Sequence, residues 1–369
     1  MIYLKKSNRI LLIIIAVCIV SGGTAFGVLM FTSWSVLPYE NTYYYKPETA
    51  SQIERININS DIGSIQVKYN ETPTDYYAQI DLDIQIKGIL VEGKSLNDFF
   101  YPIIWQNESG KVISFILDAK ASTWLTGSIS QRVKINLTLR TGVIYDINTL
   151  TSTGSISMVT PSNSILNNTK ISTSTGSVSL NAGNSTVFLG DVTISTSTGS
   201  AALTAIHTNF THDLVISTST GSLSLSFSNC AIGKRFIGTV STGSISFDSF
   251  DMKYTVDNPW LLKTSTGSIS VNIMQYTEIE ANVTGSIQTS TGSINVFYRD
   301  NLASVGAEFT GSTSTGSIDY IPVGTGGFIE TGSSTSKIIT SNDYDSAISK
   351  YTFSLSTSTG SIDVNGESL

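Results

Sequence analysis

The side chains that could carry out chemistry in this chain are few and lie far apart. The two histidines, His207 and His212, lie five residues apart in a loop-like stretch without an acidic or thiol cluster beside them. Because a metal centre needs several converging ligands, two surface histidines are the simpler interpretation. Cys18 and Cys230 cannot pair if a membrane separates them, and Cys230 is expected to be a small buried hydrophobe.

Two further groups resemble functional motifs only in part. Asp248, Asp251, Lys253 and Asp257 come nearest to the carboxylate and base cluster of a polysaccharide-acting β-helix enzyme, but a solvated loop explains them as well. The glycine-rich residues 324–327 lack the lysine of a phosphate-binding loop, and no helix signal follows them. We therefore predict no catalytic, metal-binding or cofactor-binding residue, and we expect a protein that is not an enzyme.

Composition favours strands and argues against nucleic acid as a partner. Only 13% of the 369 residues are charged, while hydroxyl side chains and glycine are abundant. Residues 1–150 hold 13 basic and 13 acidic side chains, and residues 151–369 hold 8 and 15, so the second part carries the whole net charge of −7. Phosphate neutralisation needs a basic stripe, which this sequence lacks.

The N-terminal segment predicts a membrane anchor. Residues 10–31 form an uncharged, mostly apolar run of 22 residues, long enough to cross a bilayer as one helix. Lys5, Lys6 and Arg9 precede it, which places residues 1–9 in the cytoplasm and the rest of the chain outside the cell. A cleaved signal peptide is the competing interpretation, but the apolar run is long for one.

The outward part contains seven Asn-x-Ser/Thr sequons, each a candidate for glycosylation. Their asparagines are Asn70, Asn107, Asn136, Asn167, Asn184, Asn209 and Asn282.

The strongest signal is a repeat of Ser-Thr-Gly-Ser. Its glycines are Gly154, Gly176, Gly199, Gly221, Gly243, Gly267, Gly292, Gly316 and Gly360. Successive spacings are 22 to 25 residues, and the last, 44, is twice 22, so residues 334–338 are expected to form a degenerate coil in that gap. A period of this length is typical of solenoid proteins.

The residues around each glycine predict strands rather than helices. The second and fourth residues after every repeat glycine are apolar or aromatic, and the residues between them are mostly polar, which is a period of two. A second alternating segment precedes the next motif, and no helical periodicity separates the two. We therefore predict a parallel β-helix (β-solenoid) of about nine or ten coils, roughly 45 Å long at about 4.8 Å per coil.

The motif itself suits the corner of a coil. Glycine permits backbone angles that a Cβ forbids, and stacked corners place each Ser and Thr beside its counterparts in neighbouring coils. Hydroxyl ladders are expected there. The predicted organisation is a cytoplasmic tail (1–9), a transmembrane signal anchor (10–31), a juxtamembrane linker (32–50), an N-terminal β region and cap (51–150) and the solenoid repeats (151–369).

The two ends of the solenoid are expected to differ. Residues 61–65 and 125–129 look like outlying copies of the motif, and the region 51–150 is expected to cover the open edge of the first coil. The C-terminal coil shows no cap in the sequence, since the chain ends five residues after Val364.

The Gly-Ser-Ile-x-Val segment at Gly63, the apolar strand at residues 133–139 and the following Ser-Thr-Gly-Ser-Ile units resemble the putative-adhesin domain family of bacteria and archaea. The resemblance covers roughly residues 51–369. It implies a surface β-solenoid and carries over no catalytic residues. This chain has Ser or Thr where Asp often follows the glycine in that family.

Three function classes remain open. The first is a non-catalytic, membrane-anchored adhesin or cell-surface binding protein whose partner is an extracellular glycan or protein. The second is a structural envelope protein that self-associates end to end through its C-terminal coil. The third, ranked last, is a β-helix enzyme acting on polysaccharides.

Overall fold

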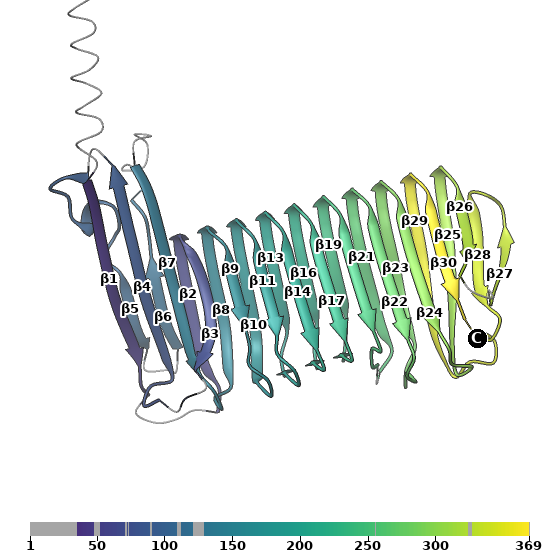
Figure 1. Ribbon diagram of the computed structural model, residues 1–369, viewed down its shortest axis with the longest axis horizontal. Helices are drawn as coiled ribbons and strands as arrows, with labels where there is room; N and C mark the ends of the chain where they lie inside the picture. The colour runs from purple at the N-terminus through teal and green to yellow at the C-terminus, as the bar shows by residue number, and fades with distance from the viewer. Residues whose placement is uncertain are drawn as a thin grey trace, which may run out of the picture.

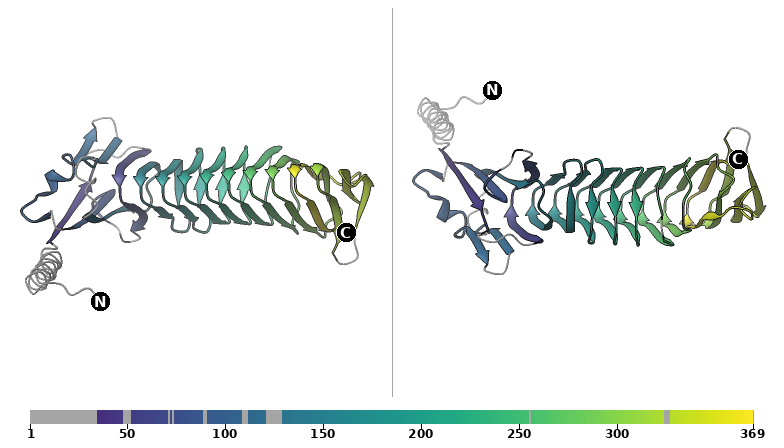
Figure 2. Two further views of the ribbon diagram at one scale, coloured as in Figure 1. Left: turned by 90° about the horizontal axis from the view of Figure 1, so that it is seen from above. Right: turned by 90° about the horizontal axis from the view of Figure 1, so that it is seen from below.

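The structure, a computed structural model, describes residues 35–47, 52–70, 72, 74–88, 91–108, 112–120, 129–254, 256–323 and 327–368. The described elements are strands, apart from one 3₁₀ turn, η2 (Leu96–Asp98). They build a long rod in which two sheets run along opposite sides (Figure 1), as the views from above and below also show (Figure 2). The predicted all-β class with long stacks of parallel strands is confirmed.

The first sheet begins with three strands of the N-terminal region and continues with one strand from each coil. Its spatial order is β1 (Ser35–Tyr45), β4 (Ala78–Gly88), β7 (Ile129–Arg140), β3 (Ser64–Asn70), β9 (Ile156–Val159), β11 (Val178–Ala182), β14 (Ala201–Ile206), β17 (Leu223–Ser228), β20 (Ile245–Phe250), β22 (Ile269–Gln275), β24 (Ile294–Asp300), β30 (Ile362–Glu367) and β26 (Ile318–Pro322).

The second sheet carries the other strand of each coil. Its pairings give the order β5 (Ile104–Glu108), β6 (Val112–Leu117), β2 (Glu54–Ile62), β8 (Tyr145–Thr153), β10 (Ile165–Thr175), β13 (Val192–Thr198), β16 (Leu214–Thr220), β19 (Phe236–Thr242), β21 (Asn258–Thr266), β23 (Val283–Thr291), β29 (Ser349–Thr359), β25 (Val305–Thr315), β28 (Ser336–Ser341) and β27 (Phe328–Gly332). A short third stack consists of β12 (Val187–Phe188), β15 (Asn209–Phe210) and β18 (Ala231–Ile232).

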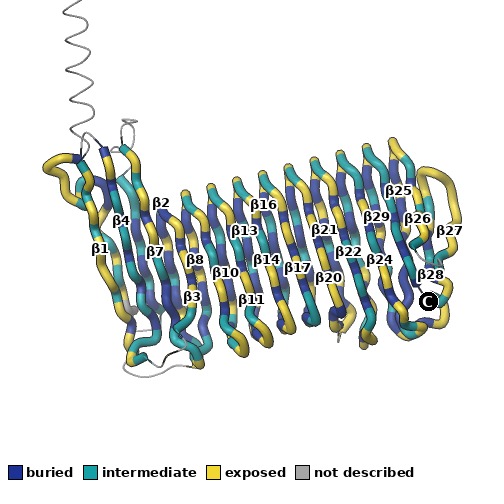
Figure 3. Tube along the Cα trace, in the orientation of Figure 1, coloured by how far each residue is buried: buried dark blue, intermediate teal, exposed yellow. Residues whose placement is uncertain are grey.

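Alternation along each strand builds the core between the sheets. In β13, Val192 and Ile194 are fully buried, whereas Thr193 between them is only half-buried on the outer side. The same alternation of buried and accessible positions continues down the rod (Figure 3). Because successive side chains of a strand point to opposite faces, every coil contributes one apolar row to a continuous core. Aromatic rings fill part of it, as with Phe188 and Phe210, whose stacked ring centroids lie 5.0 Å apart.

The N-terminal region extends both sheets past the first coil, which β2 and β3 form. Strand β7 pairs with β3 on one side of the rod, and β6 pairs with β2 on the other. Gly63 between β2 and β3 has φ +123°, and a Cβ on Gly154 would overlap its carbonyl oxygen. The outlying motif at residues 61–65 therefore occupies a corner of the stack, while residues 121–128 lie outside the described residues.

The order of coils at the distal end differs from their order in the sequence. The coil formed by β29 and β30 lies between the coil of β23 and β24 and that of β25 and β26. Strands β29 and β30 are thus paired along both edges, and β28 and β27 continue the second sheet as an antiparallel hairpin beyond β25. The expectation of an uncapped C-terminal coil is wrong, because both edges of β29 and β30 are paired and offer no free strand edge on which a second closed chain could stack.

The gap of 44 residues between Gly316 and Gly360 also has a different explanation. Residues 334–338 belong to the turn and second strand of this hairpin, and they do not form a degenerate coil. The hairpin nevertheless covers the outermost corner, since the Ile318 amide donates to the Ser334 carbonyl at 2.8 Å.

No helix in the described part of the chain is long and apolar enough to span a bilayer, and the predicted anchor at residues 10–31 lies outside the described residues.

Candidate functional site

The predicted corner glycines all lie at one edge of the rod, where a strand of the second sheet turns into a strand of the first. Their φ angles lie between +137° and +146°, a region essentially closed to residues with a Cβ. A Cβ on Gly221 would also overlap the carbonyl oxygen of Gly199 in the neighbouring coil. Both the backbone angle and the close stacking therefore require glycine.

The threonine three residues before each glycine points inward and bonds across to the next corner. The Thr218 hydroxyl donates to the Gly199 carbonyl at 2.9 Å, and equivalent bonds of 2.8 to 3.1 Å recur along the rod. Their donors are Thr151, Thr173, Thr196, Thr218, Thr264, Thr289, Thr313 and Thr357. This threonine lies immediately before the Ser-Thr-Gly-Ser motif, so the expected hydroxyl ladder did not include it, and its hydroxyl bonds to a backbone carbonyl and not to another hydroxyl.

One coil lacks this bond. Val240 occupies the inner position of β19 and is buried, and among the described residues no side-chain hydroxyl bonds to the Gly221 carbonyl. We expect V240T to raise the free energy of unfolding by about 1 kcal/mol, and T218V to lower it by about 1 to 2 kcal/mol, because valine and threonine differ mainly in the hydroxyl.

Urea unfolding curves measure both changes. The control is V215T, which adds a hydroxyl on the outer side of β16, where the free energy should change by less than about 0.5 kcal/mol. If V240T destabilised the protein, the role assigned to the inner hydroxyl would be wrong.

Outward-pointing hydroxyls at the same corners form what we call the corner ridge. It consists of the Thr before and the Ser after each repeat glycine: Thr153, Thr175, Thr198, Thr220, Thr242, Thr266, Thr291, Thr315 and Thr359, with Ser155, Ser177, Ser200, Ser222, Ser244, Ser268, Ser293, Ser317 and Ser361. The Thr side chains are exposed and stay in register although coil lengths vary.

The two columns of the ridge differ in their bonding. Along most of the rod the Ser hydroxyl oxygen accepts the amide of the next Ser, as from Ser200 to Ser177 at 3.3 Å, so its own hydrogen is left to donate outward. Within the described chain no protein group bonds to the ridge Thr hydroxyls. The ridge is a rigid, uncharged line of donors and acceptors facing solvent.

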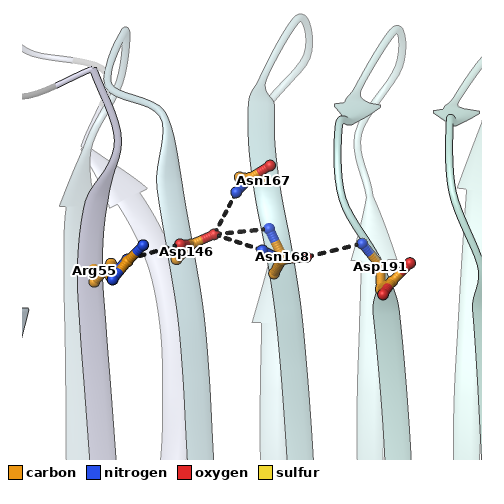
Figure 4. Close-up of polar contacts among 5 residues, drawn as sticks. All are labelled: Arg55, Asp146, Asn167, Asn168 and Asp191. Carbon is orange, nitrogen blue, oxygen red and sulfur yellow. Dashed lines mark hydrogen bonds and ion pairs between the residues drawn. The ribbon is translucent and has the colours of Figure 1, made fainter.

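A second set of polar contacts holds the opposite edge in register. Asp146 accepts the Asn168 amide at 2.9 Å, the Asn167 side-chain amide at 2.7 Å and the Arg55 guanidinium at 3.2 Å (Figure 4). The Asn168 side-chain oxygen in turn accepts the Asp191 amide at 3.1 Å. These hydrogen bonds connect the first coil, through Arg55 of β2, to the coils that follow it.

Similar hydrogen bonds are made at the equivalent position of the following coils. Asp191 accepts the Asp213 amide, and Asp213 accepts the Arg235 amide, each at 3.3 Å. The Arg235 guanidinium also bonds to this carboxylate and holds the pKa of Asp213 below its usual range. Sequence analysis missed this ladder, although Asp146, Asn168, Asp191 and Asp213 each lie eight residues before a repeat glycine.

Of the residues considered for chemistry, His212 and Cys230 make side-chain contacts within the rod. His207 lies at a turn with φ +47°, and the His212 ring bonds to the Thr211 hydroxyl at 3.0 Å. Cys230 is fully buried, and burial raises the pKa of its thiol. Across the described ranges no group of three or more His, Cys, Asp or Glu side chains could hold a metal ion.

The acidic candidates do not converge either. Asp248 accepts the Asn272 side-chain amide at 3.2 Å, Asp251 accepts the Tyr276 amide at 2.6 Å, and Asp257 accepts the Asn282 amide at 3.1 Å. Each contact links two successive coils. Of residues 324–327, only Gly327 is described, and it packs against the backbone of Ser368.

The sequons fall into three environments. Asn184, Asn209 and Asn282 are exposed. Asn70 and Asn136 are half-buried, and the Asn167 amide is engaged by Asp146. The side chain of Asn107 lies outside the described residues.

No family model matches the sequence, and no curated protein sequence matches it. A search of solved structures returns matches of low identity, of which three are described. A putative cell adhesion protein from Clostridium sporogenes is 12% identical, with 90% of this chain and 100% of that chain covered and a TM-score of 0.23. A putative adhesin from Bacteroides fragilis is 11% identical, with 90% and 97% covered and a TM-score of 0.30. A putative adhesin from Parabacteroides merdae is 11% identical, with 72% and 89% covered and a TM-score of 0.24. Similarity at this level assigns neither a family nor an activity to the chain.

Proposed function

We propose that this protein is a non-catalytic cell-surface binding protein, anchored in the membrane through residues 10–31 with its solenoid outside the cell. The corner ridge carries the proposal, because its Thr hydroxyls have no protein partner in the described chain and stand at regular intervals on a rigid edge. Side chains fixed in advance lose little conformational entropy when a ligand binds.

The chemistry of the ridge favours a neutral, hydroxyl-rich ligand such as an uncharged glycan. Each ridge Thr both donates and accepts a hydrogen bond, as a sugar hydroxyl does, and the ridge itself contains no charged side chain. Neighbouring coils repeat the same groups about every 4.8 Å. A repeating ligand can therefore engage several coils at once, and weak contacts add up through multivalency.

The test uses the full chain in liposomes against a panel of neutral and charged glycans. A variant with T198V, T220V and T242V removes three adjacent ridge hydroxyls while keeping side-chain volume. We expect its apparent affinity for neutral glycans to fall about tenfold or more, since each lost bond contributes about 0.5 to 1.5 kcal/mol.

The matched control replaces three hydroxyls away from the ridge, in T193V, T204V and T239V, and should bind within about twofold of the natural chain. Equal binding by the ridge variant would move the binding surface elsewhere on the rod. Absence of binding by the natural chain to every glycan and to whole cells would reject the proposed function.

A further inference from the structure

The coil formed by β29 and β30 fills a space between two coils that precede it in the sequence. We call the space between β23–β24 and β25–β26 the distal slot. Strand β29 pairs with β23 on one side and with β25 on the other, and β30 pairs in the same way with β24 and β26. Residues 349–368, which contain both strands, thus form an inserted segment that we call the wedge (Figure 1).

The contacts inside the slot are of the same kind as those at most other junctions in the rod. The Thr357 hydroxyl donates to Gly292 at 3.0 Å, and the Thr313 hydroxyl donates to Gly360 at 3.1 Å. The Ser361 amide donates to the Ser293 hydroxyl at 3.4 Å, as other ridge serines do. These contacts depend on the motif and not on which chain supplies it, so the same segment of a second copy meets an identical set of partners.

The connection to the wedge runs over the surface. Between β28 and β29 the chain makes a short turn at residues 342–348, in which Ile348 is 84% exposed. A change of direction in this turn would carry residues 349–368 into another molecule without disturbing the coils before it. Such exchange of an identical element is a low-cost route to a dimer.

We propose that two copies of this chain exchange residues 349–368, each filling the distal slot of the other. The exchange takes place as the chains fold, because Tyr351, Phe353 and Leu355 are fully buried once the wedge is seated. Strands β25 and β26 precede the wedge in the sequence, so the space between them and β23–β24 must be unfilled when the wedge folds into it. A neighbouring copy on the same membrane then competes with the chain's own segment.

The proposal rests on the proposed function in one respect. A pair of rods joined at their distal ends presents two corner ridges to one repeating ligand, which raises avidity without new contacts to the ligand.

The test is a cross-link between differently tagged full-length chains that all carry C18S. One chain carries T291C and the other T359C, because Thr291 and Thr359 are Cα partners in neighbouring strands and both are exposed. The chains are co-expressed, treated with a short bismaleimide and purified through both tags in turn. We expect a covalent dimer that carries both tags.

The control pair is T198C and T220C, which are also Cα partners and exposed but lie in the middle of the rod. It should give at least tenfold less dimer than the slot pair. A chain with both T291C and T359C should cross-link within itself where its own wedge fills the slot and to its partner where the wedge is exchanged, and either product checks that the two positions face each other.

Slot-pair dimer no more abundant than control-pair dimer would overturn the exchange, and so would a double variant that cross-links neither within one chain nor between two chains. Both results are distinguishable from failure of the proposed function. A chain that binds glycans in liposomes but forms no two-tag dimer keeps the function and loses the exchange. A two-tag dimer that binds no glycan would support the exchange and reject the proposed function.

Discussion

Replacing Gly221 with alanine is expected to lower the free energy of unfolding by more than about 4 kcal/mol. Two separate effects combine at this position. The φ angle of +141° lies where residues with a Cβ are strained, and the new Cβ would overlap the Gly199 carbonyl oxygen of the neighbouring coil. Neither coil can move away without breaking the pairing on its other edge, so the cost should appear as lost stability. Urea unfolding and protease sensitivity between β16 and β17 measure it.

The matched control is G238A. Gly238 lies in β19 at an inward position, where a Cβ would meet the end of the Leu262 side chain at 2.8 Å rather than backbone. Leu262 can adjust its rotamer, so this change should alter the free energy of unfolding by less than about 1 kcal/mol. Equal effects of G221A and G238A would contradict the steric role assigned to the corner glycines.

Raising the pH from about 4 to about 7 is expected to loosen the distal end of the rod. Asp300 is 3% exposed, and the Ser368 hydroxyl lies 3.2 and 3.1 Å from its two oxygens. The same hydroxyl lies 3.4 Å from Asp343, and its single hydrogen serves one carboxylate at a time. Burial and the nearby Asp343 raise the pKa of Asp300 to about 6, although the Tyr298 hydroxyl opposes the shift.

The sign of the effect follows from the raised pKa. Between pH 4 and pH 6 the folded state keeps a proton on Asp300 that the unfolded state has released. The stabilisation is complete below about pH 4 and is lost as the pH passes the folded-state pKa. A shift of about two pH units corresponds to about 3 kcal/mol at most.

Hydrogen exchange, expressed as protection factors, measures the change in local stability with pH in β29 and β30. Protection there should fall from pH 4 to pH 7, while β13 and β16 should keep theirs. D300N places a neutral side chain at the site and should remove the pH dependence, whereas D191N in the middle of the rod should not. Protection in the distal coils that does not change with pH would rule out this account of Asp300.

The sequence predicted the coil better than the order of coils. Gly221 and the alternation after it specify a corner and a buried row, and those signals are local. The position of Gly360 between Gly292 and Gly316 depends on contacts between distant parts of the sequence. The local sequence does not indicate this position, because Thr359, Gly360 and Ser361 present the same groups as every other corner. Because the strand edges of all coils are chemically alike, the motif does not specify which coil pairs with which. The insertion of the wedge between two earlier coils could therefore not be predicted from the motif.

The hydroxyls show a similar limit for the candidate site. Their spacing predicted that they would align, but their partners depend on side-chain direction. Thr218 faces inward to a carbonyl and Thr220 faces solvent, although Thr218 immediately precedes the tetrapeptide that contains Thr220. The ladder through Asp146 and Asn168 was overlooked because two residue types share one position, which hides the repeat from a search for identical letters.

Coil lengths vary by up to three residues, yet the corner glycines and ridge threonines remain in register. The extra residues are accommodated in the turns at the opposite edge, so that edge tolerates insertions while the corner edge does not. A gene that duplicates one repeat therefore adds a coil that fits its neighbours at once. Rods of this design can lengthen by single duplication events, and their descendants can diversify one edge while the other stays fixed.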